Sequence, residues 1–334
     1  MSKRFIGVDL HKKYCVFTEL DISGKVLRKG RFGNNLEEVS SFAGTLSGDT
    51  RLAVEPLLNY LWFLDQVSPF VASVHPVNPH RVRIIAEAKN KTDKYDSRIL
   101  AELLRTDFLP ESYYVPGHAR DIRDLIRQRS FLVRSRTRCK NRIRHLLFLN
   151  GSVVKATDIS SKSAIREINR LCISERTRSS IKQCLSVIDS LNIQIKAITD
   201  EVTECCRDIP DIDLLMTIPG IGSLLAITIY AEVVDINRFK NHKAFASYTG
   251  LVPTVRASGE TIHTGDITRT GSKCLRYALV EAALRAPRRS PALNSLFHRV
   301  MYRSNSQKAR VAVAHKLAII IYAMLKNREA FRDR

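Results

Sequence analysis

The chain has 334 residues, of which 44% are hydrophobic, so it is long enough for two or three domains with ordinary apolar cores. Its 54 Lys and Arg residues outnumber its 33 Asp and Glu residues, and the net charge of +21 indicates a polyanionic partner. No apolar run is long enough for a membrane span, and no signal peptide opens the chain, so we expect a cytoplasmic protein with no membrane partner. The seven cysteines lack zinc-site spacing, which indicates reduced thiols.

The N-terminal part predicts a mixed α/β sheet. Apolar alternation and apolar runs predict strands over 4–10, 13–21, 25–32, 51–55 and 71–74, and helices over 36–46 and 57–67. This order, with short connections, is typical of a mixed sheet covered by helices. Asp9 and Glu55 stand where two of the strands end, which is where functional acids tend to lie in such sheets.

Two further acids follow in Lys-Thr-Asp-Lys-Tyr-Asp-Ser, residues 91–97. Asp93 and Asp96 are three residues apart, so on a helix they share one face. Any single acid in a protein is most often a surface residue, a helix cap or a salt-bridge partner. A set of four carboxylates in a strongly basic chain, two at strand ends and two on one helix, indicates a metal site more specifically than any single acid does. We predict that Asp9, Glu55, Asp93 and Asp96 bind Mg²⁺ or Mn²⁺ beside a nucleic-acid phosphate.

Residues 121–149 predict a long helix that is basic on most of its surface. Apolar residues form one stripe, and acids are nearly absent after Asp124. A solvated helix face usually mixes charges of both signs, whereas clustered basic residues favour contact with a nucleic-acid backbone. The expected contacts are Arg123, Arg127, Arg134, Arg138 and Arg142.

Residues 176–206 carry the most regular periodicity of the chain. Apolar residues alternate spacings of three and four at Ile181, Cys184, Ile188, Leu191, Ile195, Ile198, Val202 and Cys205. Such a heptad pattern predicts a coiled coil. The seam can pair antiparallel with the basic helix of the same chain, with 150–174 as the connector, or with a second copy of the chain.

The last third predicts a mainly helical domain. Ile218-Pro-Gly-Ile-Gly222, followed by apolar residues, resembles a helix–hairpin–helix turn in which Gly220 and Gly222 let backbone amides approach a phosphate. Ser258 is expected in a short polar loop between two apolar helical regions, close in sequence to four basic residues that can bind phosphate, Arg256, Arg269, Lys273 and Arg276. Helices are expected near 292–303 and 307–326. The predicted domains are 1–115, 116–209 and 210–334.

Seven short motifs occur in one order along nearly the whole chain. They are Gly-Val-Asp at 7–9, Val-Glu at 54–55, Lys-Thr-Asp-x-x-Asp at 91–96, Ile-Pro-Gly-Ile-Gly at 218–222, Gly-Leu-x-Pro at 250–253, Ser-Gly at 258–259 and Gly-x-x-x-Leu-Arg at 271–276. In this order they resemble the RNA-guided insertion-sequence transposases of the DEDD family. The resemblance implies a RuvC-like, RNase H-like N-terminal domain and a C-terminal transposase domain, and the periodicity places long coiled-coil helices between them.

The resemblance also implies a function. The RuvC-like acids, Asp9, Glu55, Asp93 and Asp96 here, would bind metal, and Ser258 would attack DNA to form a covalent intermediate. A structured non-coding bridge RNA would pair with donor and target DNA. The protein would work as a dimer or tetramer with active sites shared between subunits, in the prokaryotic cytoplasm and at the nucleoid when active. On local chemistry alone, Ser-Gly is typical of a turn, so the role of Ser258 depends on the resemblance.

Two alternatives remain open. A metal-dependent RuvC-like nuclease or Holliday junction resolvase would use water as the nucleophile and leave no covalent adduct. A non-catalytic architectural protein would use the positive charge but would leave the acids without a role, because acids near phosphate repel it unless a metal intervenes. A tyrosine nucleophile, Tyr248 or Tyr277, lacks the accompanying motif that such a recombinase needs.

Overall fold

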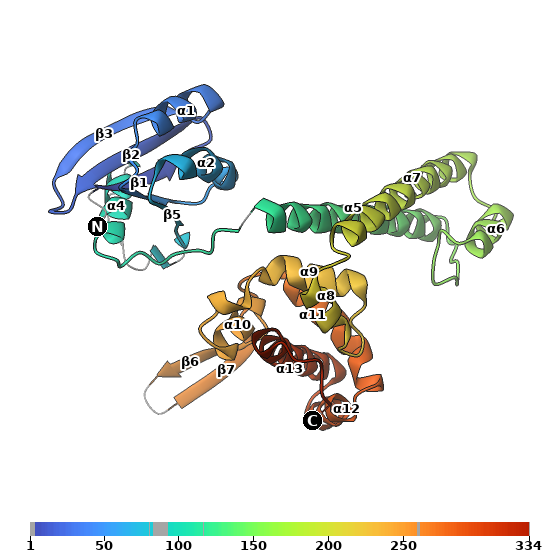
Figure 1. Ribbon diagram of the computed structural model, residues 1–334. Helices are drawn as coiled ribbons and strands as arrows, with labels where there is room; N and C mark the ends of the chain where they lie inside the picture. The colour runs from blue at the N-terminus through green and yellow to red at the C-terminus, as the bar shows by residue number, and fades with distance from the viewer. Residues whose placement is uncertain (1–3, 80, 83–92, 116, 259–260, 334) are drawn as a thin grey trace. The chain divides into compact units, whose positions relative to one another are not determined.

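The computed structural model describes residues 4–79, 81–82, 93–115, 117–258 and 261–333 (Figure 1). The chain divides into two compact units, Met1–Tyr114 and Val115–Arg334. The division into three domains stays a prediction, because the second unit contains both of the last two predicted domains. In the described ranges, no helix is both long enough and apolar enough to cross a membrane.

The first unit contains a five-stranded mixed sheet. Its strands are β1 (Arg4–Leu10), β2 (Tyr14–Asp21), β3 (Val26–Gly33), β4 (Thr50–Val54) and β5 (Ser73–Pro76), in the order β3-β2-β1-β4-β5. β1, β2 and β3 form an antiparallel meander, whereas β4 runs parallel to β1 and β5 runs parallel to β4. The predicted mixed sheet is therefore confirmed, and its architecture is compatible with an RNase H-like fold.

Helices pack on both faces of this sheet. α1 (Leu36–Gly44) and α2 (Tyr60–Val67) contribute Val39, Phe42, Phe63 and Leu64 to a core with one face of β1, and the short η1 (Ser68–Phe70) follows α2. On the other face, α4 (Asp93–Arg105) contributes Leu100 and Leu104 to a smaller core with Phe5. The sheet thus separates two apolar layers, and the acids come to lie in the α4 layer.

The second unit begins with a pair of long helices, α5 (Gly117–Leu149) and α7 (Glu175–Cys205), which pack against each other (Figure 1). The Nε atom of Arg129 donates to Thr199, and the Nη1 atom of Arg136 donates to Asn192. Residue numbers thus decrease along α7 as they increase along α5. The pair is antiparallel within one chain. The sequence did not predict α6 (Lys162–Arg170), which lies in the connector.

The heptad residues of α7 differ in burial. The prediction that this seam is buried is confirmed at every seventh position, Ile181, Ile188, Ile195 and Val202. The alternate positions Cys184, Leu191 and Ile198 are half-buried and Cys205 is exposed. Since α5 covers one side of α7, only one row of the seam is fully enclosed.

The remainder of the second unit is helical apart from one hairpin. Its helices are α8 (Pro210–Met216), α9 (Ser223–Val233), α10 (His242–Thr249), α11 (Lys273–Arg285), α12 (Pro291–Arg303) and α13 (Ser306–Asn327), with the short η2 (Ile236–Arg238) and η3 (Ala286–Arg288). α9, α11 and α13 share one core, which includes Ile229, Leu279 and Leu317. The mainly helical prediction is confirmed.

One local prediction is wrong. Ser258 does not lie in a loop between helices, because it is the last residue of β6 (Pro253–Ser258), which pairs antiparallel with β7 (Thr261–Ile267). Ser258 stands opposite Thr261 at the end of this hairpin. The signal was present in the sequence, since two runs containing β-branched residues flank the pair Gly259 and Glu260.

Candidate active site

β1 carries Asp9 toward α4. Side chains alternate along a strand, and Ile6, Val8 and Leu10 belong to the core under α1 and α2. Phe5, Gly7 and Asp9 therefore share the opposite face, where Phe5 joins the α4 core. Asp9 is 8% exposed, so its carboxylate is held close to the sheet surface rather than in open solvent.

Gly7 lets α4 approach the sheet. A Cβ atom on Gly7 would collide with the backbone carbonyl oxygen of Ser97 and the backbone nitrogen of Ala101. At the same place the hydroxyl oxygens of Thr18 and Ser97 are 2.9 Å apart in a buried hydrogen bond. These contacts fix the first turns of α4 against β1 and β2 and so bring Asp96 beside the strand that carries Asp9.

Glu55 reaches the same edge from β4. Its backbone N–H donates to the carbonyl oxygen of Val8 at 3.2 Å, which continues the parallel β1–β4 pairing by one residue. Because the carboxyl ends of parallel strands lie at one edge of a sheet, Glu55 and Asp9 become neighbours. The two acids that the sequence places at strand ends thus lie at one edge of the sheet.

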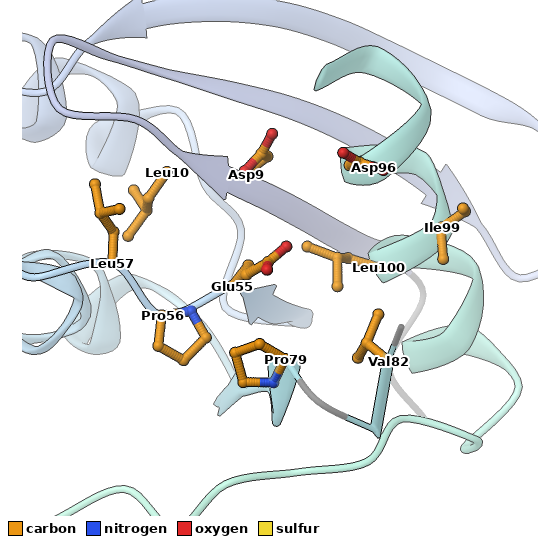
Figure 2. A pocket seen from close by; sticks show the side chains of 10 residues that line it. All are labelled: Asp9, Leu10, Glu55, Pro56, Leu57, Pro79, Val82, Asp96, Ile99 and Leu100. Carbon is orange, nitrogen blue, oxygen red and sulfur yellow. The ribbon is translucent and has the colours of Figure 1, made fainter. Parts of the chain in front are cut away.

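Asp9, Glu55 and Asp96 line one cavity of about 300 Å³ (Figure 2). Asp9 comes from β1, Asp96 from α4 and Glu55 from the segment after β4. The other lining residues are apolar, and no Lys or Arg occurs among the described residues of this wall. In a chain of charge +21, a cavity with three carboxylates and no basic residue fits the oxygen-donor chemistry of a divalent cation.

The carboxylates do not form a compact ligand set. Among the side chains that the structure describes, no group of three His, Cys, Asp or Glu residues is close enough to share one ion. Asp93 is the first residue of α4, and its side chain lies outside the described part. Three of the four predicted metal ligands thus face one cavity.

Two neighbours modify the surroundings of Asp9. His11 places its Nε2 atom 3.1 Å from a carboxylate oxygen of Asp9. Burial, with smaller contributions from the Asp9 and Glu38 carboxylates, raises the pKa of the Cys15 thiol to about 12. Cys15 therefore stays a neutral thiol and adds no negative charge near Asp9.

The predicted basic helix, α5, uses its arginines in two ways. Arg134, Arg138 and Arg142 are exposed, as contact with nucleic acid requires. Arg123 is buried, and its guanidinium donates to the backbone carbonyls of Ala231 and Glu232. This burial corrects the prediction for Arg123, which holds α5 to α9 and has no free face for a phosphate.

Glu232 is the acid that joins these helices. It is 1% exposed, and its carboxylate lies 3.3 Å from Nη2 of Arg127 and accepts a hydrogen bond from Ser272 at 2.9 Å. Ser272 caps α11, so Glu232 connects α5, α9 and the start of α11. Arg127 remains half-exposed and can still reach a ligand.

The other residues predicted to contact nucleic acid also differ in burial and in their partners. Gly220 has φ +88°, and a Cβ atom there would press on the backbone of Ala286, so this glycine is required by packing on η3. Gly222 is the N-cap of α9 with open space around it. Arg276 donates to the carbonyls of Thr249 and Thr270, while Lys273 is exposed. The side chains of Arg256 and Ser258 lie outside the described part.

Sequence reasoning missed a second basic region. No Asp or Glu occurs from Ala282 to Arg328, although basic residues recur throughout. Arg285, Arg288 and Arg310, from α11, η3 and α13, line one open hollow of about 510 Å³. The long stretch without acids was the available signal.

Comparisons with known proteins give two family matches along this chain. A family model of the DEDD, IS110 type, described as a transposase, matches residues 6–149. A second, described as the transposase IS116/IS110/IS902 family, matches residues 212–298. Asp9, Glu55, Asp93 and Asp96 fall within the first match, and Ser258 falls within the second.

Curated relatives extend the likeness over the whole chain. The transposase for insertion sequence element IS1111A of Coxiella burnetii is 26% identical over 98% of this chain and 91% of its own length. The transposase for insertion sequence element IS1328 of Yersinia enterocolitica is 24% identical over 96% of each chain. A pilin gene-inverting protein of Moraxella bovis is 30% identical over 49% of this chain and 55% of its own.

Proposed function

The chain belongs to the IS110 family of transposases, enzymes that recombine DNA, and from this premise we propose how it cleaves a strand. Asp9, Glu55, Asp93 and Asp96 would hold a divalent cation, Mg²⁺ or Mn²⁺. The Ser258 hydroxyl oxygen attacks a DNA phosphorus, the bond from phosphorus to one deoxyribose oxygen breaks, and that oxygen takes the serine proton and leaves as a free hydroxyl end. The covalent protein–DNA intermediate is resolved when the hydroxyl end of another strand attacks the phosphorus, which reforms a phosphodiester, releases Ser258 and exchanges the strands. The observation that supports this most directly is the cavity that Asp9, Glu55 and Asp96 share.

Each residue has a distinct part in this proposal. The cation, when bound, neutralises charge on the phosphate and lowers the pKa of the attacking hydroxyl. The carboxylates position it, and the close approach of α4 at Gly7 holds Asp96 in reach. Ser258 is the last residue of β6 in the β6–β7 hairpin, and Lys273 is an exposed cation available to phosphate.

The proposal extends to partners. A structured non-coding RNA guides the protein to donor and target DNA, so the protein itself need not read the bases. The chain assembles as a dimer or tetramer, and Ser258 of one subunit serves the carboxylates of another. The α5–α7 pair works as a coiled coil, and the turn at 218–222 as a helix–hairpin–helix element. The charge of +21 and the exposed arginines of α5 support the nucleic-acid partners.

The metal site is tested by Asp96→Asn, which keeps the size of the side chain and removes its charge. Strand cleavage in Mg²⁺ should fall at least about a hundredfold, since a ligand and a negative charge are removed from the site. The matched control is Glu37→Gln, an exposed acid in the first turn of α1. If Asp96→Asn cleaves DNA as fully as Glu37→Gln does, the proposed metal site is wrong.

The nucleophile distinguishes this proposal from the second candidate, a metal-dependent nuclease that uses water. Ser258→Ala should abolish both the covalent adduct and recombination while leaving folding unchanged. Thr261→Ala, on the opposing residue of the hairpin, tests the neighbouring hydroxyl. Denaturing electrophoresis of labelled DNA reads the adduct. Cleavage without any adduct in the wild type favours the nuclease, and an adduct that depends on Thr261 reassigns the nucleophile.

A further inference from the structure

A second cavity lies within the unit Val115–Arg334, where α5 meets α9 and α11. Its volume is about 310 Å³, at the lower end of the roughly 300–1,000 Å³ typical of small-ligand pockets. Apolar side chains from two helices line it, among them Ile126 of α5 and Leu224 and Leu225 of α9. We call it the α5–α11 cavity. The proposed metal ligands and nucleophile do not line it, whereas Lys273, proposed above to contact phosphate, does.

An aromatic side chain stands at this cavity. Tyr277 of α11 lines it and is 61% exposed, which leaves much of its ring open to a ligand. Burial and the Glu281 carboxylate raise the pKa of Tyr277, while Arg129 opposes them. The phenol is therefore neutral near neutral pH, and the ring offers an uncharged, flat surface. Stacking on such rings is how proteins hold unpaired nucleobases of any sequence.

Cationic side chains surround the apolar part of the cavity. Arg134 and Lys273 line it and are exposed, and neither pairs with a carboxylate in the part of the chain that the structure describes. Lys273 precedes Tyr277 by four residues on α11, so both lie on one helix face. Arg129 also lines the cavity, held by its hydrogen bond to Thr199. An apolar peptide segment would gain nothing from these cations, whereas a nucleotide carries both an apolar ring and a phosphate.

We propose that the α5–α11 cavity receives one unpaired nucleotide of a DNA strand. The base stacks on Tyr277 and packs against Leu224 and Leu225, and Lys273 and Arg134 hold the adjoining phosphate. The inference rests on the proposed function, because strand cleavage and exchange create unpaired DNA. It adds to that function a place where one base is kept out of the duplex while strands change partners.

The experiment uses the full chain and single-stranded DNA in which 2-aminopurine replaces one base at successive positions. Stacking on an aromatic ring quenches this fluorophore. At one position, wild type should quench it, and Tyr277→Ala should lose the quenching and bind roughly 5- to 100-fold more weakly. Tyr277→Phe keeps the ring face and should stay within about twofold of wild type. The matched control is Tyr302→Ala, on a tyrosine of α12 that is 83% exposed and lines no part of this cavity.

The phosphate contact has its own measurement. Lys273→Gln should lower the slope of log affinity against log salt by about 0.7, the value for one contact to a single strand. An unchanged slope contradicts the assignment of Lys273. An abasic site at the quenched position should weaken wild type as much as Tyr277→Ala does and should cost that variant nothing more.

Three results would overturn the inference. They are unchanged quenching in Tyr277→Ala, an equal loss in Tyr277→Phe, which would implicate the hydroxyl rather than the ring, and Tyr277-dependent binding of an RNA strand in clear preference to DNA. Metal-dependent cleavage by the same preparations is measured in parallel. Intact cleavage without the Tyr277 signal counts against the cavity alone, whereas absent cleavage in wild type counts against the proposed function.

Discussion

Asp9 depends on a residue that has no side chain. Gly7 stands two positions earlier on the same face of β1, and the backbone of α4 occupies the space where its Cβ would lie. Because the obstructing atoms belong to a helix backbone, they cannot move aside as the end of a flexible side chain can. The distance between Asp9 and Asp96 is thus controlled by the absence of one methyl group.

Gly7→Ala is therefore expected to push α4 off the sheet. We expect a loss of about 1–3 kcal/mol in the free energy of unfolding, typical of overpacking, together with impaired cleavage. Urea denaturation measures the first and strand cleavage the second. Gly48→Ala is the control, because nothing lies within 4 Å of a Cβ atom there. Equal stability of the two variants would show that α4 is not packed as closely as described.

Thiols give a second prediction at this scale. Cys15 and Cys206 are buried, with pKa values raised mainly by burial to about 12 and about 11, whereas Cys172 and Cys205 are exposed. An alkylating reagent at neutral pH should therefore modify Cys172 and Cys205 and reach Cys15 and Cys206 only on unfolding. Mass spectrometry of the labelled protein reads the pattern.

The same thiols link stability to pH. Their folded pKa values lie above the unfolded value of about 9, so the folded state retains protons longer. Their contribution to stability is fully present below about pH 9 and is lost as the pH rises through 11 to 12. Cys206→Ala should flatten the fall in stability over that window. Modification of Cys15 in the folded protein would contradict both expectations.

At the scale of elements, the α5–α7 pair depends on one row of side chains. Ile188 is completely buried, while Ile193, on the same helix, is 66% exposed. Ile188→Asp places an unpaired charge in the apolar contact and should cost roughly 3–5 kcal/mol. Ile193→Asp should change stability by less than about 0.5 kcal/mol. Thermal unfolding followed by circular dichroism compares them, and equal melting temperatures would exclude this packing.

Periodicity explains which elements could be predicted. β1, with its buried run, and α7, with its heptads, carry one dominant signal each, and their predicted bounds agree closely with the structure. The β6–β7 hairpin was missed because Arg256 and Ser258 interrupt its apolar character and the flanking helices dominate the region. α6 is short and lies in a segment treated as a connector. Asp9 and Glu55 were predictable because strand ends meet by topology.

The burial of individual charged residues was harder to predict than the helix on which they lie. Arg123 and Arg127 look alike in the sequence, yet one is buried and the other half-exposed. The difference comes from contacts with α9, where Arg123 donates to the backbone carbonyls of Ala231 and Glu232 and Arg127 reaches the Glu232 carboxylate. These partners are more than a hundred residues away in the chain and leave no local pattern. A basic helix can therefore be recognised from its sequence, while the free faces of its arginines cannot.

At the scale of the whole molecule, the excess positive charge is concentrated in two regions that lack acids. One is the exposed face of α5 with Arg134, Arg138 and Arg142, and the other is the hollow lined by Arg285, Arg288 and Arg310. Acids elsewhere pair with many of the remaining basic residues, as Glu204 does with Arg207. The proposed binding of donor DNA, target DNA and RNA requires more than one such surface, and exposed arginines without a carboxylate partner in the described residues are its best candidates.

The hollow can be tested separately from α5. Replacing Arg285, Arg288 and Arg310 by Gln should weaken binding to duplex DNA and reduce the slope of log affinity against log salt by about 0.9 for each phosphate that the variant no longer binds. The control carries the same change in net charge at Arg207, Arg328 and Arg332, each of which already pairs with a carboxylate. If net charge alone mattered, both triple variants would shift the slope equally. A larger shift in the hollow variant than in the control would locate phosphate contacts at Arg285, Arg288 and Arg310, and an unchanged slope would exclude them.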